Sequence, residues 1–362
     1  MREWIELQQR LVPDMLEVMA KRYAVLSRVM QSESVGRRAL AAALSMTERT
    51  LRAETDFLKA QGLIEANAAG MRVTVAGRRL VESLAPFMSE LTGLSELEQL
   101  IRRHFRLREV IVVPGDADAD RETKRELGRA AGRVLIRLLQ GRGVVAVTGG
   151  TTLAALAETI TVDQPLRDVL FVPARGGFGE SMDYQANTIA STLAKRTGAS
   201  YRLLHVPDHL SEDAYQSLMH EPNVREIIEL IRKARIVLHG IGDAMVMARR
   251  RRVDERTMAS MRAQGALAEA LGYYFDRHGA VIHRMSTVGL RLDDLETAEH
   301  VIAVAGGSSK GDAIAAVLRY GQDDVLVTDE GAARRLEAII LKERKEPHEP
   351  GEPQPDRAAS AE

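Results

Sequence analysis

Short apolar runs separated by helical patterns recur through residues 109–328 of the 362-residue chain. The runs are 109–114, 143–148, 168–173, 201–206, 235–239, 280–283, 300–305 and 324–328. Such runs are typical of strands buried on both faces, and their alternation with helices predicts a layered α/β domain around a largely parallel sheet. Ligands of such sheets bind beyond the carboxyl ends of the strands. We therefore expect a ligand site where these runs end.

Two of the apolar runs end in glycine loops that suit a phosphate. The first loop contains Gly149, Gly150, Thr151 and Thr152, and a helical pattern begins directly after it. Glycines let a backbone approach an anion closely, and a helix start offers free amide donors. The second loop, 306–311, has the sequence Gly-Gly-Ser-Ser-Lys-Gly. A tight turn is the simpler interpretation of either loop alone, but two such loops favour one phosphate pocket.

Positively charged side chains accompany these loops. Lys310 lies in the second loop, although the chain has no Gly-Lys-Ser/Thr and therefore no nucleotide P-loop. Arg175 follows the run 168–173 and could form a bidentate pair with a phosphate. The run Arg249–Arg252 could hold a second phosphate or contact another subunit. A solvated lysine, a structural salt bridge and a solvated charged face are the respective alternatives.

The stretch 184–187, Tyr-Gln-Ala-Asn, opens a further helical pattern. Its two amides, Gln185 and Asn187, suit the hydroxyl groups of a sugar. Amides at helix starts are also common as caps, so this stretch alone does not decide between the two roles.

The N-terminal part of the chain is locally basic, with eleven Lys/Arg and five Asp/Glu between residues 20 and 80. Residues 8–31 form an amphipathic pattern, a short helix is expected within 35–44, and a Ser-x-x-Glu capping box at Ser45–Glu48 predicts a helix starting near residue 46. Apolar segments on both sides of 66–70 predict a hairpin. This order is similar to the winged helix-turn-helix of bacterial regulators, whereas a generic three-helix bundle is the alternative.

In such a module the start of the second helix meets the base edges of DNA. The candidate DNA-binding residues are Thr47, Arg49, Thr50 and Arg52, with Arg72 on the hairpin directed at the phosphate backbone.

Composition excludes several classes of site. The chain has no cysteine, so disulfides, thiolate zinc sites and cysteine nucleophiles are ruled out. His205 and His209 have metal-like spacing, but Pro207 interrupts the helix that would align them. We predict no metal, no cofactor and no catalytic residue. Without a signal peptide or an 18-residue apolar stretch, a cytoplasmic protein with no membrane contact is expected.

Taken together, the motifs identify a family. The chain resembles the SorC/DeoR-type sugar-responsive bacterial repressors from about residue 10 to 343. The resemblance is carried by the segments 147–152, 174–177, 185–187, 265–275 and 305–310. It implies an N-terminal domain that binds operator DNA and a C-terminal domain that binds a phosphorylated sugar, with fructose 1,6-bisphosphate as the effector that weakens operator binding.

The resemblance also implies a fold and a set of site residues. The C-terminal domain is expected to be a three-layer α/β/α domain similar to the sugar-phosphate isomerase and CoA-transferase group. Its implied effector residues are Gly149, Gly150, Thr151, Thr152, Arg175, Gln185, Arg250, Glu269 and Lys310. We expect Glu269 to accept sugar hydroxyls or to orient an arginine. The implied assembly is a homodimer, associating into a tetramer on DNA.

The corresponding domain limits are 1–86 for a winged helix-turn-helix, 87–107 for a helical connector, 108–343 for the effector domain and 344–362 for a disordered tail. The tail prediction rests on a proline-rich and acidic composition.

A sugar-phosphate isomerase or deaminase with an accessory N-terminal domain is the rival function. The segment 237–244 resembles the glycine-aspartate turn of amino-sugar phosphate deaminases. A proton-transfer enzyme commonly needs a carboxylate and a histidine together, yet the first histidine after Asp243 is His278. We interpret this segment as a strand and a structural turn.

Overall fold

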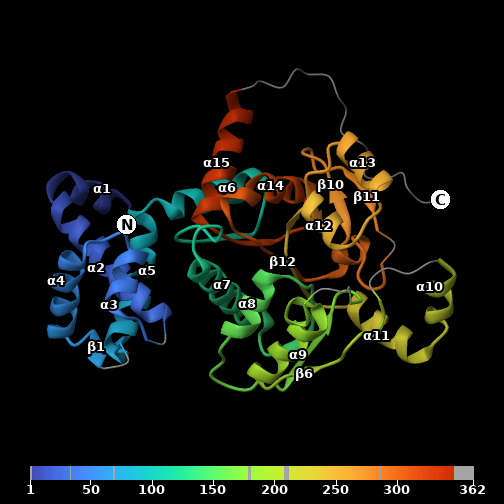
Figure 1. Ribbon diagram of the computed structural model, residues 1–362, viewed down its shortest axis with the longest axis horizontal. Helices are drawn as coiled ribbons and strands as arrows, with labels where there is room; N and C mark the ends of the chain where they lie inside the picture. Colours follow the sequence, from blue (N-terminus) through green and yellow to red (C-terminus); the bar gives the residue numbers. More distant parts are fainter. Residues whose placement is uncertain are drawn as a thin grey trace.

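The computed structural model describes residues 2–32, 34–67, 70–177, 181–207, 212–285 and 287–345, which form an N-terminal helical head and a larger α/β domain (Figure 1). The elements of the head are α1 (Arg2–Leu11), α2 (Pro13–Gln31), α3 (Arg37–Ala43), α4 (Glu48–Ala60), β1 (Ile64–Asn67), β2 (Gly70–Val73) and α5 (Val75–Leu91).

The pattern predicted as one helix over 8–31 is two helices. Val12 has a non-helical backbone and Pro13 occupies the first position of α2. Proline lacks the N–H that a continuing helix needs, but it is tolerated in a first turn. The buried face of α2 carries Leu16, Val25, Leu26 and Val29.

The helix α4 begins later than its predicted capping box. Ser45 has a left-handed backbone with φ of 51°, and the Met46 amide donates to the Ala41 carbonyl, so both residues close α3. Thr47 is the N-cap of α4, and its hydroxyl accepts a hydrogen bond from the Thr50 amide at 3.1 Å. The predicted Ser45–Glu48 box is therefore wrong by two residues.

The strands β1 and β2 form the predicted hairpin. They pair antiparallel with Ile64 opposite Val73, and Ile64 and Met71 turn into the core of the head. That core also contains Leu40, Leu51 and Leu58 from α3 and α4. The head thus has the order of a helix-turn-helix followed by a wing.

The predicted helical connector is also two helices. The helix α5 ends at Leu91, Gly93 has φ of 76°, and α6 (Leu94–Phe105) starts in a new direction. Leu94, Leu97 and Ile101 of α6 are buried in the core of the large domain. This half of the connector is packed against the α/β domain.

The main sheet of the α/β domain has seven strands in the order β3-β13-β12-β7-β4-β5-β6, all parallel. The strands are β3 (Glu109–Val113), β4 (Arg142–Val147), β5 (Asp168–Pro173), β6 (Ser200–Tyr201), β7 (Ile236–His239), β12 (His300–Val304) and β13 (Val325–Asp329). The predicted parallel sheet is confirmed.

Helices cover both faces of this sheet. One core joins it to α7 (Arg121–Leu139), α8 (Thr151–Thr159) and α9 (Ala186–Thr197). The other core joins it to α6, α11 (Pro222–Arg232), α14 (Gly311–Tyr320) and α15 (Glu330–Lys345). The domain therefore has three layers, with α10 (Glu212–Met219) next to α11 (Figure 1).

A small second sheet was not foreseen. Its four antiparallel strands follow the order β11-β10-β9-β8 and comprise β8 (Gly242–Asp243), β9 (Ala268–Ala270), β10 (Tyr273–Phe275) and β11 (Val281–Arg284). The run 280–283, predicted as part of the main sheet, forms most of β11 here. The helices α12 (Ala244–Arg250) and α13 (Glu255–Ala263) lie beside it. The domain also contains three short 3₁₀-helices, η1 (Met182–Tyr184), η2 (Asp293–Thr297) and η3 (Ser308–Lys310).

The chain leaves β4 and β7 in opposite directions, since β4 continues to β5 and β7 continues to β12. Ligands of parallel sheets bind at such a divergence. Residues 344 and 345 of the predicted tail close α15, and the remainder lies outside the described residues. Within the described ranges, no helix is both long and apolar enough to cross a membrane.

Candidate functional site: a cationic cavity at the strand ends

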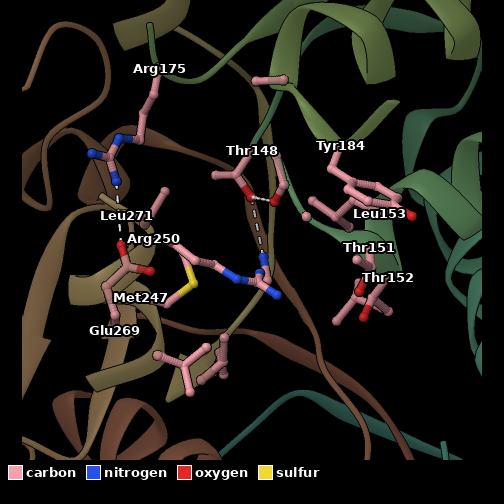
Figure 2. A pocket seen from close by; sticks show the side chains of 18 of the residues that line it. Thr148, Thr151, Thr152, Leu153, Arg175, Tyr184, Met247, Arg250, Glu269 and Leu271 are labelled. Atoms are coloured by element: carbon pink, nitrogen blue, oxygen red, sulfur yellow. Dashed lines mark hydrogen bonds and ion pairs between the residues drawn. The ribbon is translucent and has the colours of Figure 1, made fainter. Parts of the chain in front are cut away.

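A cavity of about 480 Å³ opens at the carboxyl ends of β4, β5, β7 and β12. All nine residues that the sequence proposed for the effector line it, namely Gly149, Gly150, Thr151, Thr152, Arg175, Gln185, Arg250, Glu269 and Lys310. In Figure 2, Arg175 and Glu269 lie on one side, Thr151 and Thr152 lie on the other, and the Arg250 side chain extends between them.

The loop after β4 is shaped by its two glycines. The Gly150 amide donates to the Tyr184 carbonyl at 2.8 Å, and a Cβ at Gly149 would lie 2.6 Å from the same oxygen. Gly150 also has φ of 129°, which a side chain would disfavour. The helix α8 starts directly after it without a side-chain cap, so its first turn presents amide donors and the Thr151 and Thr152 hydroxyls to the cavity.

A buried charge cluster forms the opposite wall. Glu269 on β9 accepts three hydrogen bonds at Oε1, from Arg251 Nη2 at 2.8 Å, from Arg175 Nη1 at 3.4 Å and from the Gly272 amide at 2.7 Å. The side chains of the three charged residues are at most 6% exposed. Glu269 thus pairs with two arginines, Arg175 and Arg251. The guanidinium groups are thereby fixed before any ligand arrives.

Lys310 provides a different kind of charge. It lies in η3 after β12, and its half-buried side chain lines the cavity. Burial lowers the pKa of Lys310, and the nearby charges of Lys124 and Arg250 lower it further, against the opposing effect of Asp118 and Asp329. Cations that disfavour one another in this way would be stabilised by a bound anion.

Two cations of the cavity were not among the nine residues proposed from the sequence. Lys124 comes from the first turn of α7, and Arg251 is the C-cap of α12, next to the predicted Arg250. Arg251 belonged to the four-arginine run, but its pairing with Glu269 depends on the second sheet. Lys124 could have been suspected, because a helix that follows a parallel strand starts at the same edge as the ligand site.

The glycine loop before Lys310 is held by acidic side chains. Asp329 Oδ2 accepts from the Gly307 amide at 2.7 Å, Asp116 Oδ1 from the Ser308 amide at 3.2 Å, and Asp118 Oδ2 from the Ser309 amide at 2.9 Å. Gly307 has φ of 105°, again a conformation that favours glycine. The three carboxylates thus fix the backbone that positions Lys310.

The segment with the deaminase-like sequence has a structural role. Asp243 lines the cavity but caps α12, accepting from the Val246 amide at 2.8 Å. The nearby His239 is buried and places Nε2 2.6 Å from Asp323 Oδ1. Burial disfavours the charged imidazole, but the Asp323 carboxylate outweighs this effect and raises the pKa of His239.

Of the two histidines considered for metal binding, His209 lies outside the described residues. Elsewhere in the described part of the chain, no group of three His, Asp or Glu side chains could hold a metal ion.

The candidate DNA-binding residues lie on the head. Arg49, Thr50 and Arg52 are in the first turns of α4, with both arginine side chains exposed, and Arg72 is exposed on β2. Thr47 is the cap of α4, and its hydroxyl lies 2.8 Å from that of Thr50. Three exposed arginines therefore lie on the second helix and on the wing of the head.

Two family models match the chain. One is described as "Putative sugar-binding domain" and covers residues 89–337, and the other is the CggR N-terminal DNA-binding domain and covers residues 18–88. The chain is 48% identical over 337 residues to the central glycolytic genes regulator of Priestia megaterium, covering 93% of this chain and 98% of that protein. It is 44% identical over 336 residues to the Bacillus subtilis protein of the same name, covering 93% and 99%.

A solved structure described as a SorC family transcriptional regulator from Enterococcus faecalis is similar as well. It has 38% sequence identity and a TM-score of 0.62, and the match covers 67% of this chain and 99% of that one. The two domain matches, the near full-length relatives and this structure agree with one another. The chain belongs to the SorC family of sugar-binding transcriptional regulators, with a CggR-type N-terminal DNA-binding domain.

Proposed function

We propose that the chain represses central glycolytic genes and that its affinity for operator DNA falls when fructose 1,6-bisphosphate occupies the cavity. The observation that carries the proposal is the convergence of a glycine-led helix start with Lys124, Arg175, Arg250, Arg251 and Lys310 on one cavity. A bisphosphate brings up to about four negative charges and needs more donors than one phosphate does. Two relatives are named central glycolytic genes regulators, which supports the target genes.

The nine predicted residues divide by chemistry. The amides and hydroxyls of 149–152 suit phosphate oxygens, as do the guanidinium groups of Arg175 and Arg250 and the ammonium group of Lys310. Gln185 suits a sugar hydroxyl. Glu269 holds Arg175 and Arg251 in place, which makes it a positioning residue for the arginines.

For the head, we propose that Thr47, Arg49, Thr50 and Arg52 face base edges in the major groove and that Arg72 on the wing contacts the phosphate backbone. The exposure of the three arginines supports these roles. A two-fold operator requires at least a dimer, and a tetramer on DNA is the assembly we propose.

We also retain the proposed limits of 1–86 for the head, 87–107 for the connector and 108–343 for the effector domain. Kinship of the three-layer domain with the sugar-phosphate isomerase and CoA-transferase group is part of the same proposal, supported by a cavity at the ends of parallel strands.

Regulation then follows from linkage. If the bisphosphate weakens operator binding, operator DNA must weaken bisphosphate binding by the same factor. Typical coupling corresponds to a change of roughly 5- to 150-fold in affinity.

The test combines a thermal-shift panel with DNA binding. Fructose 1,6-bisphosphate, fructose 6-phosphate, glucose 6-phosphate and inorganic phosphate are added to the full chain, and affinity is measured for a duplex that the chain selects from a random library. We expect the bisphosphate to give the largest rise in melting temperature and to weaken DNA binding. No effect of any sugar phosphate on DNA affinity would refute the proposal, and turnover of these sugars seen by ³¹P NMR would favour the enzyme alternative.

A further inference from the structure

The first turn of α7 contacts the DNA-binding head. Arg28 of α2 forms a bidentate pair with Asp120, the N-cap of α7, with N···O distances of 2.6 and 3.2 Å. Further along α7, Arg129 Nη2 donates to the backbone oxygen of Gln31, the last residue of α2, at 2.7 Å. Figure 1 shows α7 on the side of the α/β domain that faces the head. The two domains are therefore tied by charged contacts between α2 and α7.

The segment just before α7 supports the cavity. Asp116 and Asp118 accept the amides of Ser308 and Ser309, which directly precede Lys310. The Asp120 amide in turn donates to the Asp116 carbonyl at 2.9 Å. Within one short turn, Asp116 and Asp118 thus contact the glycine loop of the cavity, and Asp120 contacts the head.

The same segment enters the cavity at its other end. Lys124 lies four residues after Asp120, one helical turn along α7, and lines the cavity. A phosphate bound by Lys310 and Lys124 would therefore affect the segment 116–124 at two places. Before Asp120, it would do so through the loop that Asp116 and Asp118 hold. After Asp120, it would do so through Lys124 on α7 itself.

We propose that residues 116–124 transmit occupation of the cavity to the head and that the Arg28–Asp120 pair is the contact through which operator affinity changes. This inference rests on the proposed function, because it assumes that a sugar bisphosphate alters DNA binding. It adds the physical route by which the two sites are coupled.

The Arg28–Asp120 contact has the properties that such a route needs. The side chains of Arg28 and Asp120 are 19% and 39% exposed, so water can replace their partners when the pair separates. A partly exposed ion pair contributes little to folding. The head can therefore move relative to α7 without unfolding either domain, whereas the buried cluster around Glu269 cannot exchange its partners so readily.

The test uses one variant on each side of the contact. Arg28→Ala removes the guanidinium, and Asp120→Ser removes the carboxylate while serine still caps α7. Arg137→Ala is the control, since Arg137 lies at the far end of α7 and pairs with Glu109 of its own domain. For each full-length chain, the Kd for fructose 1,6-bisphosphate is measured by calorimetry, and the Kd for the selected duplex is measured with and without the bisphosphate.

We expect Arg28→Ala and Asp120→Ser to bind the bisphosphate within about threefold of the wild type, while the bisphosphate changes their DNA affinity by less than about twofold. Arg137→Ala should keep the wild-type response. If the wild type responds and Asp120→Ser responds equally, the inference is wrong while the proposed function stands. If the wild type itself does not respond, the proposed function is wrong.

Discussion

Lys124 and Lys310 reach the same cavity from different elements, α7 and η3, and the charge of Lys124 helps to lower the pKa of Lys310. The positive charge is concentrated there before any ligand binds. Like charges held together by the fold are destabilising by themselves, so the arrangement favours an anionic partner.

The depressed pKa of Lys310 predicts a pH dependence of ligand binding. A phosphate binds the protonated lysine, so affinity for fructose 1,6-bisphosphate should begin to fall as pH rises through the lowered pKa, below the ordinary lysine range. Lys124→Gln removes a like charge and should move the start of this fall to higher pH. Lys310→Gln should remove this early part of the fall. Calorimetry from pH 7 to 10 measures all three curves, and an unchanged curve in Lys310→Gln would contradict the assignment.

The cluster around Glu269 predicts a large cost for removing its carboxylate. Glu269→Gln leaves Arg175 and Arg251 without the carboxylate that holds them, and breaking a buried pair in this way typically costs about 3–5 kcal/mol. Glu226→Gln is the control, because its pair with Arg202 is about half exposed and should change the free energy of unfolding by less than about 1 kcal/mol. Urea unfolding measures both, and equal effects would refute the prediction.

The arginines of α4 predict selective loss of DNA binding. Arg49→Ala and Arg52→Ala should each weaken operator affinity and, where the contact is to a phosphate, reduce the slope of log K against log salt by about one. Their response to the bisphosphate in a thermal-shift assay should be unchanged, since neither residue lines the cavity. Arg103→Ala on the exposed side of α6 is the control. Fluorescence anisotropy at several salt concentrations provides the measurement.

Thr152→Ala and Arg175→Ala should behave in the opposite way. Both variants keep the head intact, so they should bind operator DNA like the wild type but lose most of the response to the bisphosphate. Anisotropy titrations with the ligand decide the matter, and loss of DNA binding by these variants would show that the sites are misassigned.

The His239–Asp323 pair predicts a pH-dependent stability. The pKa of His239 is raised in the folded state, so its stabilising contribution is complete below about pH 6.5, the unfolded value, and is lost as pH rises through the folded pKa. His239→Gln should remove this part of the pH dependence. Between pH 6 and 9, the free energy of unfolding should therefore depend less on pH in the variant than in the wild type.

The sequence predicted the parts of the fold that depend on local pattern. Apolar runs predicted six of the seven parallel strands, but of the run 201–206 only Tyr201 lies in a strand, β6. Glycines with polar neighbours predicted the loops that meet at the cavity. The errors fall where backbone conformation is decided by one residue: Pro13 ends the first helix pattern early, Ser45 closes α3, and Gly93 separates α5 from α6. Proline at position 13 is itself a signal for a helix start, which the apolar periodicity of 8–31 obscured, whereas the left-handed backbone of Ser45 is not specified by its residue type.

Lys124 and Arg251 were missed for a different reason. The helix α7 connects β3, at the edge of the sheet, with β4. Because β13, β12 and β7 lie between these two strands, α7 crosses them, and the start of α7 lies near the loop that follows β12. The position of Lys124 at a helix start indicates only that it lies at the ligand edge of the sheet, whereas the strand order determines that it lies beside the cavity. Arg251 likewise depends on the small antiparallel sheet, whose short strands have no clear alternation in the sequence.

The divergence of the chain at β4 and β7 has an evolutionary consequence. Because much of the cavity is lined from loops beyond the strand ends, a loop side chain such as Gln185 can change without disturbing the packing between the sheet and its helices, whereas buried lining residues such as Glu269 cannot. New ligand preferences can thus be acquired by single substitutions at the loop positions, while the scaffold retains its stability. A single architecture of this kind can serve many metabolic signals.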